Sequence, residues 1–221
     1  SVQVCTQTLF DELGIKEYPA KEVVAGINHM AWLLDIRDAK GNDLYPMVRK
    51  LALEKSQSEK HYDMVRFEYI RRLGYYCTES SEHNAEYNPF FIKGKKPELI
   101  ERYNIPLDEY PRRCIGHVKA WDDQRNQIMQ GGKITHERTK EYGSYIMEAM
   151  ITGKVYKIGG NVLNQGAITN LPAEACVEVP CFVDREGVHA SIVGKLPVQL
   201  AAMNQTNINP QLLTIEAAVT G

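Results

Sequence analysis

Two stretches of this sequence place a histidine where it could do chemistry. His29 is the single histidine of the apolar run at residues 25–32 (AGINHMAW). Such a run is typical of a buried strand, and side chains at strand ends in an α/β sheet project into ligand crevices. His29 is therefore either a core histidine bonded to a backbone carbonyl, or a metal ligand or substrate contact. The run alone leaves both interpretations open.

The second stretch is the polar run at residues 79–89, which contains His83. Its side chains from Glu79 to Asn84, together with Glu86, can exchange protons or form hydrogen bonds. A solvated turn explains such a run, because loops are generally polar. Aromatic residues flank the run, however, and a polar cluster with aromatic walls is also suited to binding a sugar. These residues are Tyr75, Tyr76, Tyr87, Phe90 and Phe91.

Composition limits the classes of protein to consider. The 221 residues suit one large domain or two small ones with a sizeable core. The formal net charge is −2 without a basic stripe, so no nucleic-acid partner is expected. No apolar run has the length needed to cross a membrane. The five cysteines are odd in number and lack C-x-x-C spacing, which indicates reduced thiols in a cytoplasmic protein.

The hydrophobic pattern predicts a mixed arrangement of helices and strands around these two stretches. Glycines are expected to end helices at residues 1–13, 62–73 and 138–152. Further helices are predicted at 45–53, at 106–129 with a break near Pro111, and after Pro197 and Pro210. Residues 54–60 are expected to be mobile. Strands are predicted within 23–36, at 155–158 and 161–163, and as a hairpin of 177–184 with 188–196.

Two predicted helices carry aromatic residues at helical spacing. In the helix at 138–152, Tyr142 and Tyr145 belong to an apolar stripe that is more typical of a packed core than of a site. In the helix at 106–129, the expected apolar face consists of Tyr110, Cys114, Val118, Trp121 and Ile128. Periodicity by itself indicates only a globular domain.

Five motifs, in this order, resemble the bacterial α-galactosidases of glycoside hydrolase family 4. They are residues 26–32 (GINHMAW), 79–87 (ESSEHNAEY), 170–172 (NLP), 177–181 (VEVPC) and 205–209 (QTNIN). The resemblance covers the later part of a family member. It implies that residues 1–221 form the C-terminal domain for substrate, metal and oligomerisation, with helices packed on a mostly antiparallel sheet, as in lactate and malate dehydrogenases.

The same resemblance implies that an N-terminal NAD-binding Rossmann domain precedes this chain. Ser1 would then directly follow a Cys-His pair whose cysteine is a further metal ligand. It also implies hydrolysis of α-galactosides by oxidation, elimination, addition and reduction. NAD would oxidise C3 of the sugar, and a divalent metal, Mn²⁺, would polarise the resulting ketone. A base would then remove the C2 proton before the leaving group departs.

Residue roles follow from matching this sequence to the family motifs. His29 matches the metal-ligating histidine, and Asn28 is a substrate contact. His83 is the expected base, with Tyr87 as its rival, because other branches have a tyrosine or an aspartate there. Glu82 and Glu86 orient the base or bind sugar hydroxyls, unless they are merely solvated carboxylates. Tyr142 and Asn164 are further expected substrate contacts.

The resemblance leaves other functions open. The absence of a clear basic pocket motif favours a non-phosphorylated galactoside of the melibiose or raffinose type, and a homo-oligomer is expected. The chain could instead be an inactive fragment for sugar binding and oligomerisation, or part of a family 4 α-glucosidase or α-galacturonidase. A lactate or malate dehydrogenase relative is a further alternative, but its His-Asp relay motif is not recognisable here. Hydride transfer to a free 2-oxo acid would identify that alternative.

Overall fold

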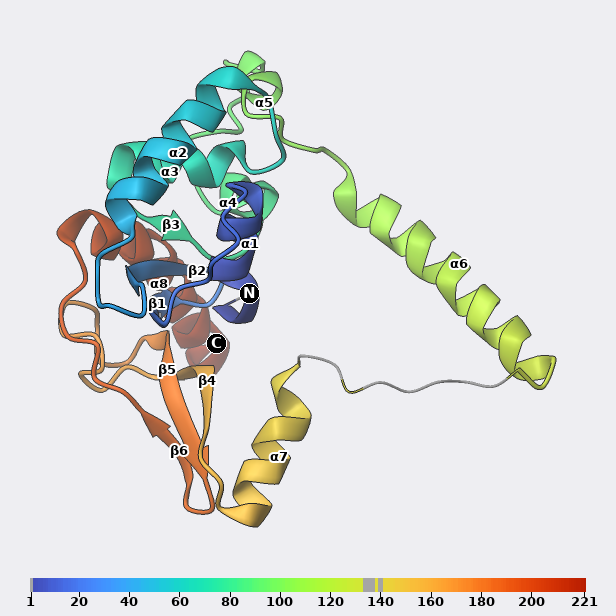
Figure 1. Cartoon of the computed structure of the whole chain (residues 1–221), viewed down its shortest axis with the longest axis vertical. Coiled ribbons are helices and arrows are strands. Elements are labelled where there is room, and N and C mark those ends of the chain that lie inside the picture. Colours follow the sequence, from blue (N-terminus) through green and yellow to red (C-terminus); the bar gives the residue numbers. More distant parts are fainter. Residues whose placement is uncertain (1, 133–137, 139–140) are drawn as a thin grey trace. The chain divides into compact units, whose positions relative to one another are not determined.

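The computed structural model describes residues 2–132, 138 and 141–221, apart from the side chain of Gln3, and Figure 1 shows it as a cartoon. The chain divides into two compact units, Ser1–Ile105 with Gly143–Gly221, and Pro106–Tyr142. The helices are η1 (Val2–Val4), α1 (Cys5–Glu12), α2 (Tyr45–Ser58), α3 (Met64–Leu73), α4 (Ser81–Glu86), α5 (Glu98–Arg102), α6 (Glu109–Met129), α7 (Tyr142–Thr152) and α8 (Val198–Thr220). The strands are β1 (Lys21–Ile27), β2 (Met30–Arg37), β3 (Tyr76–Cys77), β4 (Tyr156–Leu163), β5 (Cys176–Asp184) and β6 (Gly187–Ala190).

The strands of the first unit form an antiparallel sheet. Their order is β3-β2-β1-β5-β4, and β6 pairs with β5 (Figure 1). Helices α1, α2 and α3 bury their apolar side chains in one cluster with residues of β1 and β2, including Leu33. Burial of this kind stabilises a fold by about 25 cal/mol for each Å² of apolar surface. The predicted mixed α+β class with a mostly antiparallel sheet is confirmed.

Helix α8 contacts the opposite face of β2. Successive side chains of a strand alternate between faces, so Met30 and Trp32 point away from the side of Leu33. There the Asn204 side chain of α8 donates a hydrogen bond to the Met30 carbonyl (2.7 Å) and accepts one from Trp32 Nε1 (3.3 Å). Strand β2 is therefore covered by α1 to α3 on the face of Leu33, and on the other face by α8 together with Tyr69 of α3, whose ring centroid lies 5.6 Å from that of Trp32.

The apolar run at 23–36 folds as a hairpin, with β1 and β2 joined by Asn28 and His29. His29 has a φ of 65°, a conformation that histidine tolerates better than most residues. Gly26 permits the close approach of the two strands, because a Cβ there would lie 2.6 Å from the Met30 carbonyl oxygen. The expected strand-end position of His29 is thus corrected: the histidine lies in the turn of a hairpin.

Three predicted interruptions of helices are wrong. Residues 54–58 continue α2, where Lys55 forms ion pairs with Glu12 (3.2 Å) and Glu59 (2.9 Å). Pro111 does not break α6, because it lies in the first turn, where the missing N–H costs no helical hydrogen bond. Pro210 lies inside α8, which runs unbroken from Val198. One lost backbone bond does not end this helix.

Other boundaries also differ from the expected ones. Helix α7 begins at Tyr142, and part of its expected first turn lies outside the described residues. Strand β4 runs through Gly159 and Gly160 as one strand, because all eight of its residues pair with β5. Helix ends at Gly14, Gly74 and Gly153 agree with prediction. Among the described residues, the structure has no helix with the length and apolar character needed to cross a membrane.

Candidate functional site

His29 lies at the centre of a cluster of titratable side chains. Its Nδ1 forms a hydrogen bond with the Tyr87 hydroxyl (2.7 Å), and its Nε2 lies 3.8 Å from Glu79 Oε2. The His29 side chain is 43% exposed. A core histidine bonded to a backbone carbonyl does not fit this exposure and these partners. Of the two interpretations of His29, the structure therefore favours a group that can meet a ligand.

The polar run at 79–89 contains the short helix α4 rather than only a solvated turn. Ser80 begins it in the extended conformation, and its hydroxyl accepts a hydrogen bond from the His83 backbone N–H (3.2 Å). A serine at this position satisfies one of the free N–H groups of the first helical turn. The cap fixes the backbone from which the His83 side chain projects.

Buried hydrogen bonds attach α4 to the rest of the unit. The Ser81 hydroxyl donates to Asp63 Oδ1 (2.7 Å), which also accepts from Arg66 Nε (2.5 Å). The Tyr76 hydroxyl donates to Asp63 Oδ2 (2.5 Å). Asn84 donates to the Thr78 carbonyl (2.8 Å). Because buried polar groups are costly unless they are paired, this network strongly restricts where α4 can lie.

The two histidine rings and the Tyr87 ring lie together. The centroids of His29 and His83 are 6.1 Å apart with an interplanar angle of 19°, and Tyr87 lies 5.6 Å from His29 and 6.2 Å from His83. His83 Nδ1 is bonded to Glu86 Oε2 (3.0 Å). The structure thus brings together His29, His83, Glu86 and Tyr87, which the sequence separates by up to 58 residues.

A small pocket opens beside His29. Its volume is about 200 Å³, and Asn28 lies in its wall with His29. The other lining residues are Ile27, Met30, Tyr87, Asn207 and Gln211. Amide and phenol groups at the wall can donate and accept hydrogen bonds, as the recognition of a polyhydroxylated ligand requires.

Negative charge and burial shift two pKa values near this cluster. Burial and the charges of Glu79 and Glu86 raise the pKa of Tyr87. Glu178, opposite Gly26 on β5, is only 7% exposed. Burial, with a smaller contribution from the charge of Glu79, raises the pKa of Glu178 to about 7. A cation in this region would meet a negative potential.

Three further residues were expected to belong to the site. Glu82 is on α4 and half-buried. Asn164 is buried, and its amide donates to the carbonyls of Ile168 (2.9 Å) and Leu171 (2.9 Å), which favours a role in shaping that loop. Tyr142 belongs to the second unit, which is described by itself, so its expected substrate contact remains a prediction.

Sequence reasoning did not single out four residues of this region: Glu79, Glu178, Asn207 and Gln211. Glu79 was available only as a member of the polar run, without a role of its own. Asn207 and Glu178 lie inside two of the family motifs, at 205–209 and 177–181. The one local signal was Glu178, an acidic residue within the apolar strand pattern of 177–181. A glutamate at such a position draws attention because glutamates are rarely buried unless they are paired.

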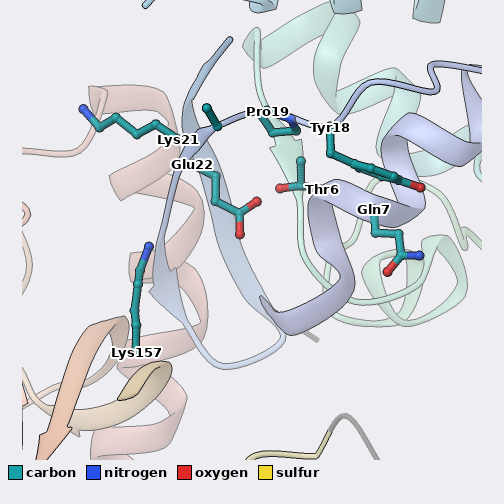
Figure 2. Close-up of a pocket in the computed structure, with 8 residues that line it drawn as sticks. Thr6, Gln7, Tyr18, Pro19, Lys21, Glu22 and Lys157 are labelled. Atoms are coloured by element: carbon teal, nitrogen blue, oxygen red, sulfur yellow. The ribbon is translucent and has the colours of Figure 1, made fainter. Parts of the chain in front are cut away.

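A larger hollow lies between α1, β1 and β4. Its volume is about 410 Å³, and Figure 2 shows the side chains of Thr6, Glu22 and Lys157 around it. Lys21, which also lines it, forms an ion pair with Asp35 (3.2 Å). None of the expected site residues lines this hollow, so size alone does not identify the site.

The donors at His29 suit a divalent metal but do not complete its coordination. Imidazole and carboxylate are appropriate ligands for ions such as Mn²⁺. In the described part of the chain, no group of three or more His, Cys, Asp or Glu side chains is placed to hold a metal ion. His29 and Glu79 therefore fit part of a metal site, and further ligands would have to come from elsewhere.

Comparison with known proteins places this fold in a family of glycosidases. Residues 24–221 match the family described as "Family 4 glycosyl hydrolase C-terminal domain", so the chain belongs to glycosyl hydrolase family 4. It is 57% identical over its whole length to an alpha-galactosidase of Bacillus subtilis (strain 168) and 32% identical to one of Rhizobium meliloti (strain 1021). It spans 50% and 46% of these two relatives, about half of their length.

Solved structures support the fold. The crystal structure of the putative glucosidase lplD from Bacillus subtilis gives a TM-score of 0.81 at 22% identity, and the alignment covers 99% of this chain and 53% of that one. A 6-phospho-alpha-glucosidase from gut microorganisms, solved in complex with NAD and Mn²⁺, gives 0.71 at 18% identity, covering 98% and 51%. At these identities the likeness concerns the fold alone.

Proposed function

We propose that this chain is the C-terminal part of an α-galactosidase that requires NAD and a divalent metal, Mn²⁺. The observation that carries the proposal is the 57% identity, over the whole chain, to a relative named alpha-galactosidase. The cluster around His29 supports it, since this cluster provides a metal donor, a base and hydrogen-bonding groups beside one pocket. The proposed substrate is a non-phosphorylated α-galactoside.

Each group of the cluster has a role in this proposal. When bound, NAD and the metal supply hydride transfer and polarisation of the sugar ketone, which makes the C2 proton acidic. His29 would hold the metal through Nε2. His83 accepts the C2 proton, and the Glu86 carboxylate bonded to its Nδ1 orients the ring and stabilises the imidazolium that forms (3.0 Å). Asn28 binds sugar hydroxyls at the pocket wall.

Half of the relatives' length is absent from this chain, so the chain alone is expected to show no turnover. The decisive experiment is a chimera in which these 221 residues replace the matching half of the Bacillus subtilis relative. With NAD, Mn²⁺ and a reductant, we expect it to hydrolyse 4-nitrophenyl α-galactoside, and to lose at least 100-fold in rate when His29 is replaced by Gln.

The chimera also separates the alternatives. Hydrolysis of an α-glucoside or an α-galacturonide in preference to the α-galactoside would overturn the substrate assignment. A folded chimera that binds NAD but cleaves none of these glycosides would overturn the enzymatic proposal and favour a binding or assembly role. The proposed setting is a cytoplasmic homo-oligomer, in agreement with the five free cysteines.

A further inference from the structure

We infer that Glu79 is a carboxylate ligand of the divalent metal at His29, and that Tyr87 is the positioning residue that leaves His29 Nε2 available to this ion. The inference rests on the proposed function, because it concerns the same metal. It assigns two residues of this chain to roles that differ from those expected from the sequence. Glu79 had no individual role, and Tyr87 was an alternative base.

The spacing of the two donor atoms supports a shared ion. His29 Nε2 and Glu79 Oε2 are 3.8 Å apart, too far for a hydrogen bond. Two donors that each lie about 2.1 Å from one ion are separated by about 3.0 Å when they are adjacent in an octahedron, and by at most about 4.2 Å. The observed separation falls within this range. The two atoms could therefore coordinate one ion with little movement.

Tyr87 determines which imidazole nitrogen faces the ion. Its hydroxyl is bonded to His29 Nδ1 at 2.7 Å, so Nε2 is the nitrogen left for coordination. A metal-bound Nε2 requires the proton on Nδ1, and a phenol oxygen can accept that hydrogen bond. The same hydroxyl can donate to an unprotonated Nδ1 before the ion binds. Tyr87 can thus keep the ring in one orientation in both states.

The backbone holds Glu79 close to the hairpin. The preceding residue, Thr78, donates its N–H to the Ala31 carbonyl (2.8 Å), and its hydroxyl accepts from the Ala31 N–H (3.0 Å). Ala31 is two residues from His29. The two hydrogen bonds between Thr78 and Ala31 therefore hold the backbone of Glu79 close to that of His29. Glu79 itself has a φ of 67°, which is unfavourable for a glutamate. Strain of this kind is concentrated at functional sites, where the surroundings enforce it.

The test is Mn²⁺ binding to the 221-residue chain, measured from the electron paramagnetic resonance signal of free Mn²⁺. Broadening of the His29 ring protons in NMR spectra locates the ion. We expect Glu79→Gln to weaken Mn²⁺ binding at least tenfold, and Tyr87→Phe to weaken it by about 10- to 100-fold. Glu54→Gln and Tyr62→Phe are matched controls at exposed positions outside the site and should bind as the unchanged chain does.

Two outcomes would overturn the inference. One is Glu79→Gln binding Mn²⁺ as tightly as the unchanged chain, with His29 still broadened. The other is an unchanged chain that binds Mn²⁺ without any response of the His29 ring protons. A correctly folded Glu79→Asp variant, which keeps the charge, should bind better than Glu79→Gln; equal binding would contradict a ligand role.

The chimera distinguishes this inference from the proposed function. Glu79→Gln in the chimera should raise the Mn²⁺ concentration for half-maximal hydrolysis at least tenfold, whereas Glu54→Gln should not. An active chimera with an unchanged Mn²⁺ requirement would contradict the role of Glu79 and leave the α-galactosidase proposal intact. An inactive chimera would contradict the function, and Mn²⁺ binding to the chain would still decide the inference.

Discussion

At the scale of single residues, Glu178 is a carboxyl group in a place that disfavours its charge. It is buried on β5, and its pKa is raised to about 7 chiefly by that burial. The unfolded chain holds this group near its ordinary pKa of 4.5. The folded protein therefore binds the proton more tightly. Its stability must fall as the pH rises from about 4.5 to about 7, after which the cost remains constant.

Replacing Glu178 by Gln should remove this cost. We expect Glu178→Gln to raise the free energy of unfolding by about 1 to 3 kcal/mol at pH 8 and to change it little at pH 4.5, because the folded group is then neutral and the unfolded group is only about half ionised. Urea unfolding at the two pH values measures the difference. Glu186→Gln, in the exposed turn between β5 and β6, is the control. An equal effect of Glu178→Gln at both pH values would contradict the explanation.

At the scale of elements, the buried Asp63 carboxylate connects α3, α4 and β3. It accepts hydrogen bonds from Arg66, Ser81 and Tyr76 and is fully buried. The Arg66 guanidinium is also buried and lies over the Tyr76 ring, 4.5 Å from its centroid. Removing one partner of a buried ion pair leaves an uncompensated charge in the core. The folded protein is then much less stable than with the intact pair, or with apolar residues in place of both partners.

Asp63→Asn should therefore be strongly destabilising although it preserves shape. We expect a loss of about 3 to 5 kcal/mol in the free energy of unfolding, because Arg66 would remain charged and buried without a carboxylate. Chemical denaturation measures this loss. Asp35→Asn, whose partners Lys21 and Arg37 are largely exposed, should cost about 1 kcal/mol or less. Similar losses for both variants would argue against the importance of burial.

Elements with local signals could be predicted from the sequence. The helix at 62–73 has helical apolar spacing, and Gly74 ends it with a φ of 85°. The turn of the β1–β2 hairpin was missed, because apolar residues continue on both sides and the positive φ falls on His29 rather than on a glycine. Pro111 and Pro210 were misjudged because their effect depends on their position within a helix.

The residues of the site also divide into those that could be predicted from the sequence and those that could not. His29, Asn28, His83 and Tyr87 were predicted through the family motifs, and the structure places them together. Their partners could not be predicted, because the contacts join residues far apart in the chain. Asn207 of α8, for example, lines the same pocket as His29. Only the folded arrangement of β2 and α8 creates that proximity.

At the scale of the whole molecule, the two tryptophans report on separate units. Trp32 lies in the sheet of the first unit and is fully buried, whereas Trp121 of α6 is 60% exposed. Within α6, every residue of which is described, none is buried. The apolar face predicted for this helix, including Tyr110 and Val118, is thus not buried within its own unit.

This difference predicts two fluorescence populations. Iodide should quench Trp121 strongly and Trp32 hardly at all until the sheet unfolds, because quenching requires contact with the indole. A Trp121→Phe variant should therefore retain blue-shifted, weakly quenched emission, and Trp32→Phe should retain the accessible component. Iodide titration measures both. Protection of Trp121 in the native chain would show that something covers α6, and a dependence on protein concentration would identify a second copy.

The hydrogen bonds of Asn204 with Met30 and Trp32 also constrain when the site can form during synthesis. They join residues 172 and 174 positions apart, so the hairpin that bears His29 is made long before its α8 partner leaves the ribosome. Until then one face of β2, with the large Trp32 side chain, has no cover from α8. Nascent chains at this stage are candidates for chaperone binding, since uncovered apolar surface favours aggregation. The pocket beside His29, which Asn207 and Gln211 of α8 also line, is consequently completed only after this helix has been synthesised.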